Sequence, residues 1–474
     1  MTREARFVTG PTMRHVSVMT ATGAVGLTAL FLVDAANLFY ISLIGRAELT
    51  AALGYAATLQ FFLVSVSIGL SIAATAVVSR AVGAGDWEGA RQLAASSMAT
   101  LVAVLALVAA GVWIWRDAAL GLLGASGEAR AVAGDFLAIV LPSLPLLGIG
   151  MVSGGLLRAV ADARRAMWVT LGGGLIGAVL DPIFIFGLGL EVTGAAIVSV
   201  IARVAIAAIA LRAVLGVHDM VGRIGLAGAA RDARQILAIA LPAVATQVST
   251  PFGNAWIMRL VSEFGDEAAA GWAVLWRVIS LVFGGIFALS GAVGPILGQN
   301  WGAGRLDRVG QAFRDAILFA ALYVAVAWFL MWHGAGAIVA VFGLTGAGAE
   351  IVRAFGAYGA GLFAFTAALF VSNAAFNTLG RPLASTAFNW ARDAAVIPIL
   401  VALVGVSLGA EGAVVVQGAA GMLVGSLALA AALRHVARLG PAPIAARAVP
   451  APVADPLPET ASEGAGLPIR PASG

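Results

Sequence analysis

The sequence predicts an all-α integral membrane protein built from two related halves. Hydrophobic residues make up 61% of the chain, charged residues only 11%, and the mean hydropathy is +0.98. This composition is typical of a chain that spans a membrane many times. The long apolar stretches lack the alternating polarity of β-barrel strands. They are therefore expected to be helices, which satisfy their backbone hydrogen bonds internally.

The two halves are recognised by an internal duplication. The segment VVSRAVGAGDWEGARQ returns almost half a chain later as ILGQNWGAGRLDRVGQ, which aligns Gly83 with Gly302. The same alignment, continued without a gap, places Ala161 on Gly380. Solenoid repeats have periods of roughly 20 to 50 residues, so a repeat spaced this far apart indicates a duplicated domain.

Twelve candidate spans of about 20 to 30 residues fit the chain, six in each copy. Because six is an even number, both copies enter the bilayer in the same direction, and an axis along the membrane normal should relate them. The proline- and alanine-rich tail is expected to be disordered. The predicted parts are an N-terminal segment at 1–15, a six-helix lobe at 16–215, a linker at 216–234, a second six-helix lobe at 235–436 and the tail at 437–474.

The charges predict how the spans are oriented. All 28 basic residues are arginine. The loops on one side carry many of them, such as Arg80, Arg164 and Arg305, whereas the loops on the other side are mixed or acidic. By the positive-inside rule the arginine-bearing loops and both termini are cytoplasmic, which predicts a multi-pass protein of a bacterial inner membrane. The arginines are scattered rather than clustered on a soluble face, so nucleic acid is not an expected partner. Residues 1–15 precede a span too long for a signal-peptide core, so no cleaved signal is expected.

Several motifs follow the order found in a known family. The chain resembles the multidrug and toxic compound extrusion (MATE) transporters in the first-span aspartate with LIGRAELTAALGYA after it, and in RAVGAGDWEGARQ, LLRAVADAR, LDPIFIFGLGLEVTGAAIVSV and GPILGQNWGAGRLDRV. The resemblance covers roughly residues 16–436. It implies a central cavity that faces alternately in and out, and export of organic compounds driven by entry of H+ or Na+. It does not identify the substrate.

Asp34 is the first candidate for the coupling chemistry. A charge at mid-membrane depth costs several kcal/mol unless it is paired, protonated or hydrated, so an acid there is a functional candidate. Asp34 lies about ten residues from the outer end of the first span, and Asn37 shares its helix face. It matches the family's first-span aspartate, which binds the coupling cation. The alternative is a carboxyl group that is hydrogen-bonded to a neighbouring helix.

Asp181 is the second candidate, at a similar depth in the fifth span. Pro182 follows it and has no N–H, which frees the carbonyl of Ala178 as a possible cation ligand. Ser199 on the sixth span lies where many relatives have threonine, and its hydroxyl would complete a site with the two carboxylates. The alternatives are that the Asp-Pro pair only bends its helix, and that Ser199 bonds back to its own helix.

The two acids together suggest a competition mechanism. Two carboxylates held close in a low dielectric cannot both stay ionised, so one is expected to take up a proton near working pH. Gly177 stands where many relatives have an asparagine, which favours H+ over Na+, although Na+ at Asp34 and Asp181 remains the alternative. Arg203, one turn beyond Ser199, would weaken proton coupling if it paired with either acid.

The second lobe offers candidates for substrate binding rather than for coupling. Asn254 takes the place that Asp34 has in the first lobe, and no acid occurs at 354–379, so coupling is expected in the first lobe. Polar side chains on three spans are expected to line a cavity for bulky, amphipathic cations. The alternative for each is an interhelical hydrogen bond. These residues are Gln60, Gln247, Asn254, Asn373 and Asn377.

Two other functions are alternatives to export. A lipid-linked oligosaccharide flippase would need a cationic cavity, for which Arg203, Arg277 and Arg392 are candidates. An enzyme is not expected, because the GAG loops have neither a preceding strand nor a lysine to form a phosphate-binding loop. We expect no cofactor and no resident metal ion, only the H+ gradient, and as partners only small organic substrates and the bilayer. The protein is expected to be a monomer.

Overall fold

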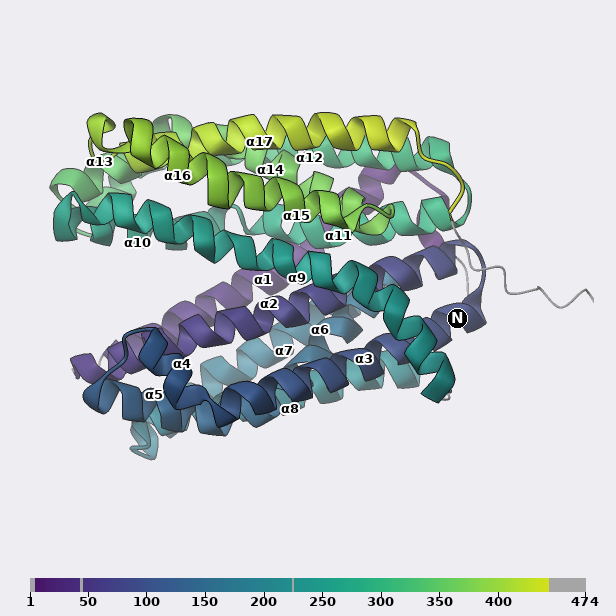
Figure 1. Ribbon diagram of the computed structural model, residues 1–474, viewed down its shortest axis with the longest axis horizontal. Helices are drawn as coiled ribbons and strands as arrows, with labels where there is room; N and C mark the ends of the chain where they lie inside the picture. Colours follow the sequence, from purple (N-terminus) through teal and green to yellow (C-terminus); the bar gives the residue numbers. More distant parts are fainter. Residues whose placement is uncertain (1–4, 43–45, 224–225, 443–474) are drawn as a thin grey trace, which may run out of the picture. The chain divides into compact units, whose positions relative to one another are not determined.

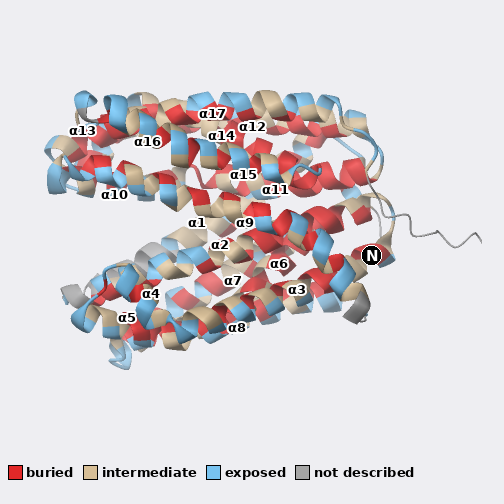
Figure 2. Ribbon diagram, viewed as in Figure 1, coloured by how far each residue is buried: buried red, intermediate tan, exposed pale blue. Residues whose placement is uncertain are grey.

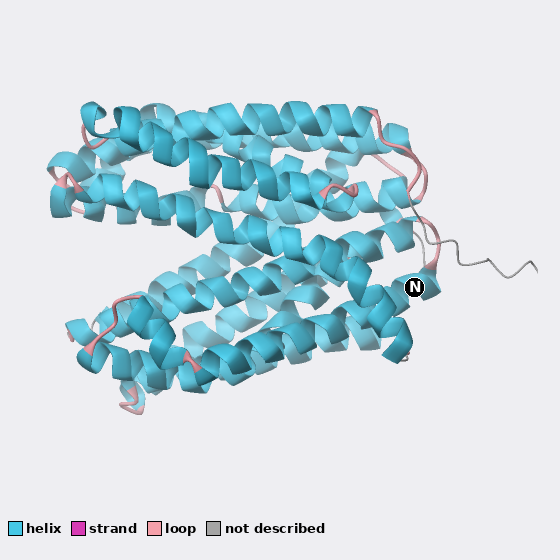
Figure 3. Cartoon of the chain, viewed as in Figure 1, coloured by secondary structure: helices cyan, strands magenta, loops and turns pink. Residues whose placement is uncertain are grey.

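The computed structural model describes residues 5–42, 46–223 and 226–442, except the side chains of residues 33–39, 41, 42, 47, 48, 50, 226, 227 and 406. This described part consists of helices and loops, without a strand (Figure 3). The first half contains η1 Arg6–Val8, α1 Thr12–Ser42, α2 Ala47–Gly83, α3 Trp87–Ile114, α4 Arg116–Leu122, α5 Gly127–Val140, η2 Leu141–Ser143, α6 Leu144–Ala159, α7 Ala163–Pro182, η3 Ile183–Gly187, α8 Glu191–Leu211 and η4 Arg212–Val217.

The second half repeats this order of helices (Figure 1). It contains α9 Leu226–Ser262, α10 Gly265–Val282, α11 Gly284–Gly302, α12 Leu306–Val341, α13 Gly346–Ala354, η5 Phe355–Gly359, α14 Ala360–Thr378, α15 Pro382–Trp390, η6 Ala391–Val396, α16 Ile397–Leu400, η7 Val401–Gly405, η8 Val406–Leu408 and α17 Gly412–Ala437. Most of the predicted tail, residues 443–474, lies outside the described residues.

The predicted number of spans is confirmed. Within the described residues, 11 helices are long and apolar enough to cross a membrane, and the pair α10 and α11, bent by 46°, brings the number to 12. Figure 2 shows buried residues on the sides of helices that face other helices, and exposed residues on the outer sides. Large apolar side chains such as Leu107 and Val326 are exposed there, as expected where lipid is the solvent.

The duplication is visible in the backbone. Helices α2 and α11 end at Gly83 and Gly302, the two glycines that the sequence aligns. The loops after α6 and α14 each contain a residue of positive φ at aligned positions, Ala161 at +61° and Gly380 at +87°. This region of backbone conformation favours glycine, so Ala161 carries strain that Gly380 avoids. The two six-helix lobes are therefore copies of one unit.

Each lobe has its own apolar core, but the start of each lobe's first helix packs in the core of the other lobe. Val16 and Met19 of α1 lie in the core of the second lobe. Ile236 and Ile239 of α9 lie in the core of the first lobe. The repeat aligns Val16 with Ile236 and Met19 with Ile239, once a gap of a single position is allowed between the copies. The first turns of each lobe's first helix thus pack inside the other lobe.

The lobes meet where α2 crosses α11. A Cβ atom added at Gly83 would meet the backbone carbonyl of Gln299, and one added at Gly302 would meet the backbone carbonyl of Arg80. Arg80 and Gln299 are themselves aligned by the repeat, so the contact is reciprocal. Glycine is required at both positions because the two backbones approach too closely for any side chain.

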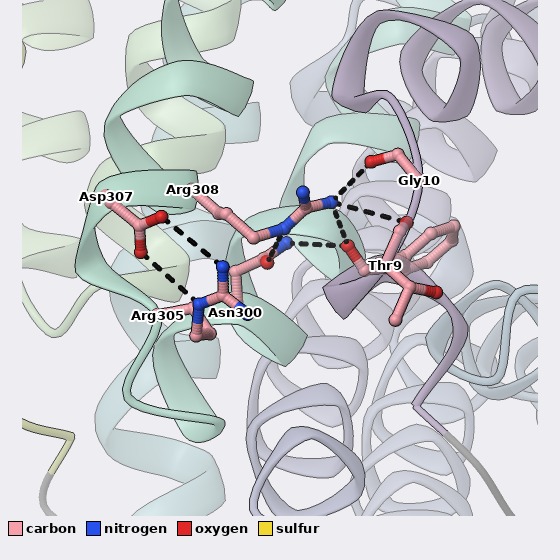
Figure 4. Close-up of polar contacts among 7 residues, drawn as sticks. Thr9, Gly10, Asn300, Arg305, Asp307 and Arg308 are labelled. Atoms are coloured by element: carbon pink, nitrogen blue, oxygen red, sulfur yellow. Dashed lines mark hydrogen bonds and ion pairs between the residues drawn. The ribbon is translucent and has the colours of Figure 1, made fainter.

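The segment before α1 holds the second lobe at this end of the bundle (Figure 4). The Nη2 atom of Arg308 donates to three carbonyl oxygens, those of Phe7, Thr9 and Gly10, at 3.0, 3.3 and 2.8 Å. Its Nε atom donates to Oδ1 of Asn300 at 3.0 Å. Hydrogen bonds from a charged donor are stronger than neutral ones, so this arginine fixes the segment against the end of α11 and the start of α12.

The linker before α9 makes a comparable contact with the first lobe. The backbone N–H of Gly222 donates to the carbonyl of Arg91 at 3.0 Å. The Nη2 atom of Arg91 pairs with Oδ1 of Asp219 at 2.8 Å. The segments that lead into the two lobes therefore cross, each one bound to the other lobe.

The half-buried carboxylate of Asp162 organises the connection between α6 and α7. Asp162 accepts hydrogen bonds from the backbone N–H of Arg165 at 3.1 Å, from Nη1 of Arg165 at 2.6 Å and from Nε2 of His218 at 2.8 Å. The burial of Asp162 opposes its ionisation, but the hydrogen bonds from His218 and Arg165 and the charge of Arg165 outweigh that effect. They hold the pKa of Asp162 well below its usual value of 3.8.

We expect Asp162→Asn to lower the apparent stability at neutral pH by about 1 to 3 kcal/mol, because it leaves the guanidinium of Arg165 without an ionised acceptor. The stabilisation is complete above the pKa of the unfolded state and is lost as the pH falls towards the depressed native pKa. Melting temperatures of the parent and the variant should therefore converge below about pH 4. A gap that stays constant down to about pH 3 would contradict this account.

Candidate functional site

The two predicted coupling acids belong to neighbouring helices. Asp34 and Asn37 lie in the last third of α1, but their side chains are outside the described residues. Helices α1 and α7 pack closely, since a Cβ atom at Gly26 would lie 3.4 Å from Cβ of Thr170. At 1.5 Å per residue, Asp34 lies about 12 Å beyond this contact and Asp181 about 17 Å, and the two spans run in the same direction. The two positions are therefore at similar depths.

Asp181 occupies an irregular and buried position. Its exposed fraction is 2%, and it lies in the last turn of α7, directly before Pro182. The chain continues as the π-helical turn η3, Ile183–Gly187. Such turns are rare, and they frequently occur at functional sites. The α-helix thus ends at the Asp-Pro pair within the span, and a carboxylate lies where the backbone pattern changes.

Ser199 makes the helix-internal bond that was its alternative interpretation. Its hydroxyl donates to the carbonyl of Ala195 at 2.9 Å. The oxygen keeps lone pairs that accept or coordinate, so a role beside Asp181 stays a prediction.

Arg203 is buried in the first lobe and bound to oxygen atoms. Its Nη1 atom donates to the carbonyl of Val140 at 2.9 Å and to Oγ of Ser143 at 3.0 Å. Its Nη2 atom donates to Oε1 of Gln60 at 2.7 Å. The arginine thereby joins α8 to α2 and to the end of α5. Gln60, predicted to line the substrate cavity, is half-buried and occupied by this interhelical bond.

Two predicted cavity residues of the second lobe belong to a buried polar network. Asn373 accepts from Nδ2 of Asn389 at 3.0 Å, and Asn377 accepts from Oγ of Ser385 at 2.9 Å. Asn373 and Asn377 are 8% and 3% exposed. These are the interhelical bonds that the sequence left open as the alternative, and they join α14 to α15.

The sequence interpretation missed an acid in the second lobe. Asp393 is 1% exposed and pairs with its neighbour Arg392, whose Nε and Nη2 atoms lie 2.7 and 3.2 Å from its two oxygens. It also accepts from Oγ of Ser249 on α9 at 2.8 Å. Asp393 is an acid at mid-span, like Asp34 and Asp181. It belongs to the span that follows residues 354–379, where no acid occurs.

Asn254 and Gln247 lie on the same side of α9. A cavity of about 340 Å³ is formed between α9 and α10. Gln247 lies two turns before Asn254 and is half-buried. The cavity is lined by Asn254, Met258, Trp272, Ala273, Trp276 and Arg277. Asn254 is thus the predicted cavity residue that the structure places at a cavity wall.

The comparison with known families decides the class of the protein. The family model described as MatE matches residues 24–183 and 242–404, most of both lobes. This chain belongs to the MATE family. Members of the family are transporters, and the twelve spans in two lobes are the expected architecture.

Two curated relatives of this MATE chain have names that differ in cargo. It is 26% identical over 338 residues to the protein named FAD transporter from Shewanella oneidensis. This match covers 68% of this chain and 74% of that protein. It is 24% identical over 298 residues to the multidrug export protein MepA from Staphylococcus aureus. This match covers 61% of this chain and 66% of that protein.

The fold of this MATE chain is also found in solved structures. One, described as the outward-facing conformation of a multidrug resistance MATE family transporter of the MOP superfamily, has a TM-score of 0.85 and 20% identity. The match covers 93% of this chain and 100% of that chain. At this identity the likeness concerns the fold alone.

Proposed function

We propose that this MATE protein is a secondary active exporter that exchanges organic compounds for H+ by alternating access. The observation that carries the proposal is the buried Asp181 at the irregular end of α7, beside the helix that contains Asp34. With the acids ionised, the first lobe admits a cation. Protonation of the acids removes the negative charge that attracts the cation. The bound compound can then leave the site. Asn37 and Ser199 would supply neutral oxygens to the same site.

H+ is favoured over Na+ as the coupling ion. A tight Na+ site needs several oxygen ligands in addition to the acids, and Gly177, one turn before Asp181, provides no side chain. Na+ held by Asp34 and Asp181 is the alternative. The flippase alternative loses part of its support, because Arg203 and Arg392 are buried and bonded rather than directed into a cavity, whereas Arg277 lines one.

The cargo has two candidate classes. The pair of acids favours the amphipathic cations expected from the sequence, and the relative named a multidrug export protein is compatible with them. The relative named FAD transporter supports an anionic aromatic cargo instead. The arginine loops support a placement in the inner membrane with both termini cytoplasmic, and we propose that the monomer is the working unit.

The test is transport by the purified protein in proteoliposomes under separate pH and Na+ gradients, with ethidium as the cationic probe and FMN as the anionic one. We expect a pH gradient to drive movement of at least one probe, and an Na+ gradient alone to drive neither. Movement of a probe under an Na+ gradient alone would refute H+ as the coupling ion. Movement independent of both gradients would refute antiport and favour the flippase.

A further inference from the structure

The cavity between α9 and α10 contains a combination of side chains that the coupling mechanism does not use. Arg277 and Trp276 lie next to each other on α10, and Asn254 and Met258 face them from α9. Trp276 and Met258 are 37% and 43% exposed, so both present free surface to the cavity. Among the residues that line it there is one charge, the guanidinium of Arg277, and no acid.

The α9 residues that line the cavity lie near the face of α9 that packs against the first lobe. Val244 of α9 packs against α2, because a Cβ atom at Gly69 would lie 2.7 Å from the backbone nitrogen of Val244. Residues three or four apart share one face of a helix, so Gln247, Asn254 and Met258 continue the face of Val244. Figure 1 shows α9 on the side of the second lobe next to α1 and α2.

The depth of Arg277 requires water around its charge. It lies 12 residues after the start of α10, or about 18 Å along the helix, near the middle of a hydrocarbon layer of about 30 Å. Arg277 is exposed, and a guanidinium exposed to lipid at that depth costs several kcal/mol. Water in the cavity between α9 and α10 would remove this cost. Arg277 therefore marks a hydrated surface at mid-membrane depth.

We propose that this cavity binds the acidic group of an aromatic cargo, a phosphate or a carboxylate, on Arg277, with the ring system against Trp276. A guanidinium binds these anions through two parallel hydrogen bonds, and indole rings stack on flat aromatic systems. The amide of Asn254 supplies a further donor. The inference rests on the proposed export function and adds the class of its substrate, which is anionic and aromatic.

The cavity in the second lobe then carries a charge opposite to that of the predicted coupling acids in the first lobe. Asn254 is the counterpart of Asp34 in the same alignment that pairs Met19 with Ile239. The first lobe has the acids that take up the coupling cation, and the second lobe has the cation that holds the cargo. Each ligand is thus kept out of the other's site by its charge.

The test compares FMN with riboflavin, which has the same ring system without the phosphate. Binding to the purified protein is measured by quenching of flavin fluorescence in the absence of any gradient. We expect the parent to bind FMN at least about tenfold more tightly than riboflavin, since a hydrogen bond to a charged group contributes about 1.5 to 3 kcal/mol. Arg277→Gln should abolish this preference and leave riboflavin binding within about twofold. Arg277→Lys should retain part of it.

The matched control is Arg259→Gln, which removes one arginine from the exposed end of α9, where its guanidinium lies over Trp256. It should keep the preference for FMN. Equal affinities for the two flavins in the parent, or no binding of FMN, would overturn the proposal, as would an unchanged preference in Arg277→Gln. Because binding needs no gradient, loss of coupling with intact FMN preference would refute only the exchange mechanism.

Discussion

Replacing either Asp34 or Asp181 by asparagine should reduce gradient-driven efflux by at least about tenfold, since a positioned proton-transfer group typically contributes about 10²–10⁴ to a rate. An amide has nearly the shape of a carboxyl group but does not exchange a proton, so cargo binding and ion uptake become uncoupled. The measurement is the initial rate of efflux from proteoliposomes under an imposed pH gradient. Binding of FMN without a gradient should persist in both variants, because its proposed site is in the second lobe.

Asp266→Asn is the matched control, because Asp266 is an exposed acid in the first turn of α10 and should leave the rate unchanged. Gradient-driven efflux that survives in Asp181→Asn would show that this buried acid is structural. Efflux that survives in both first-lobe variants but is lost in Asp393→Asn would move the coupling site to the second lobe, where Asp393 is buried against Arg392 and Ser249.

The double variant Ser79→Cys with Gly298→Cys should form a disulfide on oxidation and stop transport. A Cβ atom at Gly298 would lie 2.9 Å from Cβ of Ser79, and a disulfide needs about 3.5 to 4.5 Å, so a small shift suffices. The bond joins α2 to α11, and alternating access requires these lobes to separate at this end. The chain has no cysteine of its own, so no other disulfide can form.

We expect efflux to fall below about a tenth of the parent rate after oxidation and to recover with dithiothreitol, as for a locked rigid-body motion. The control pair, Ser71→Cys with Gly155→Cys, joins two helices of the same lobe, where a Cβ atom at Gly155 would lie 2.9 Å from Oγ of Ser71. It should transport normally when oxidised. Full activity of the crosslinked Ser79 and Gly298 pair would contradict rocking of the lobes about this contact.

Much of the fold could be predicted, because hydropathy defines the spans and the alignment of Gly83 with Gly302 defines the repeat. What the alignment cannot give is the lobe in which a segment packs. It pairs Met19 with Ile239, but only the structure places each of them in the opposite core. The pattern of apolar residues is the same for either choice, because a helix face that is complementary to one copy is complementary to the other.

The candidate site was predicted unevenly. Asp181 followed from the cost of a charge at mid-membrane depth, and the structure places it where the helix changes its hydrogen-bond pattern. The partners of polar side chains could not be predicted in the same way. Asn373 and Asn377 are polar, as cavity residues often are, yet side chains of the neighbouring α15 donate hydrogen bonds to their oxygens. A sequence gives the chemistry of a group but not the distance to its nearest partner.

The exchange of leading segments has a consequence for how the protein is made. When the first six spans have left the ribosome, the core of the first lobe still lacks Ile236 and Ile239, which belong to the seventh span. Val16 and Met19 in turn have no core to fill until the second lobe has been inserted. Domains of many proteins fold in order of synthesis. Here neither lobe can be completed alone, and the two reach their final packing together.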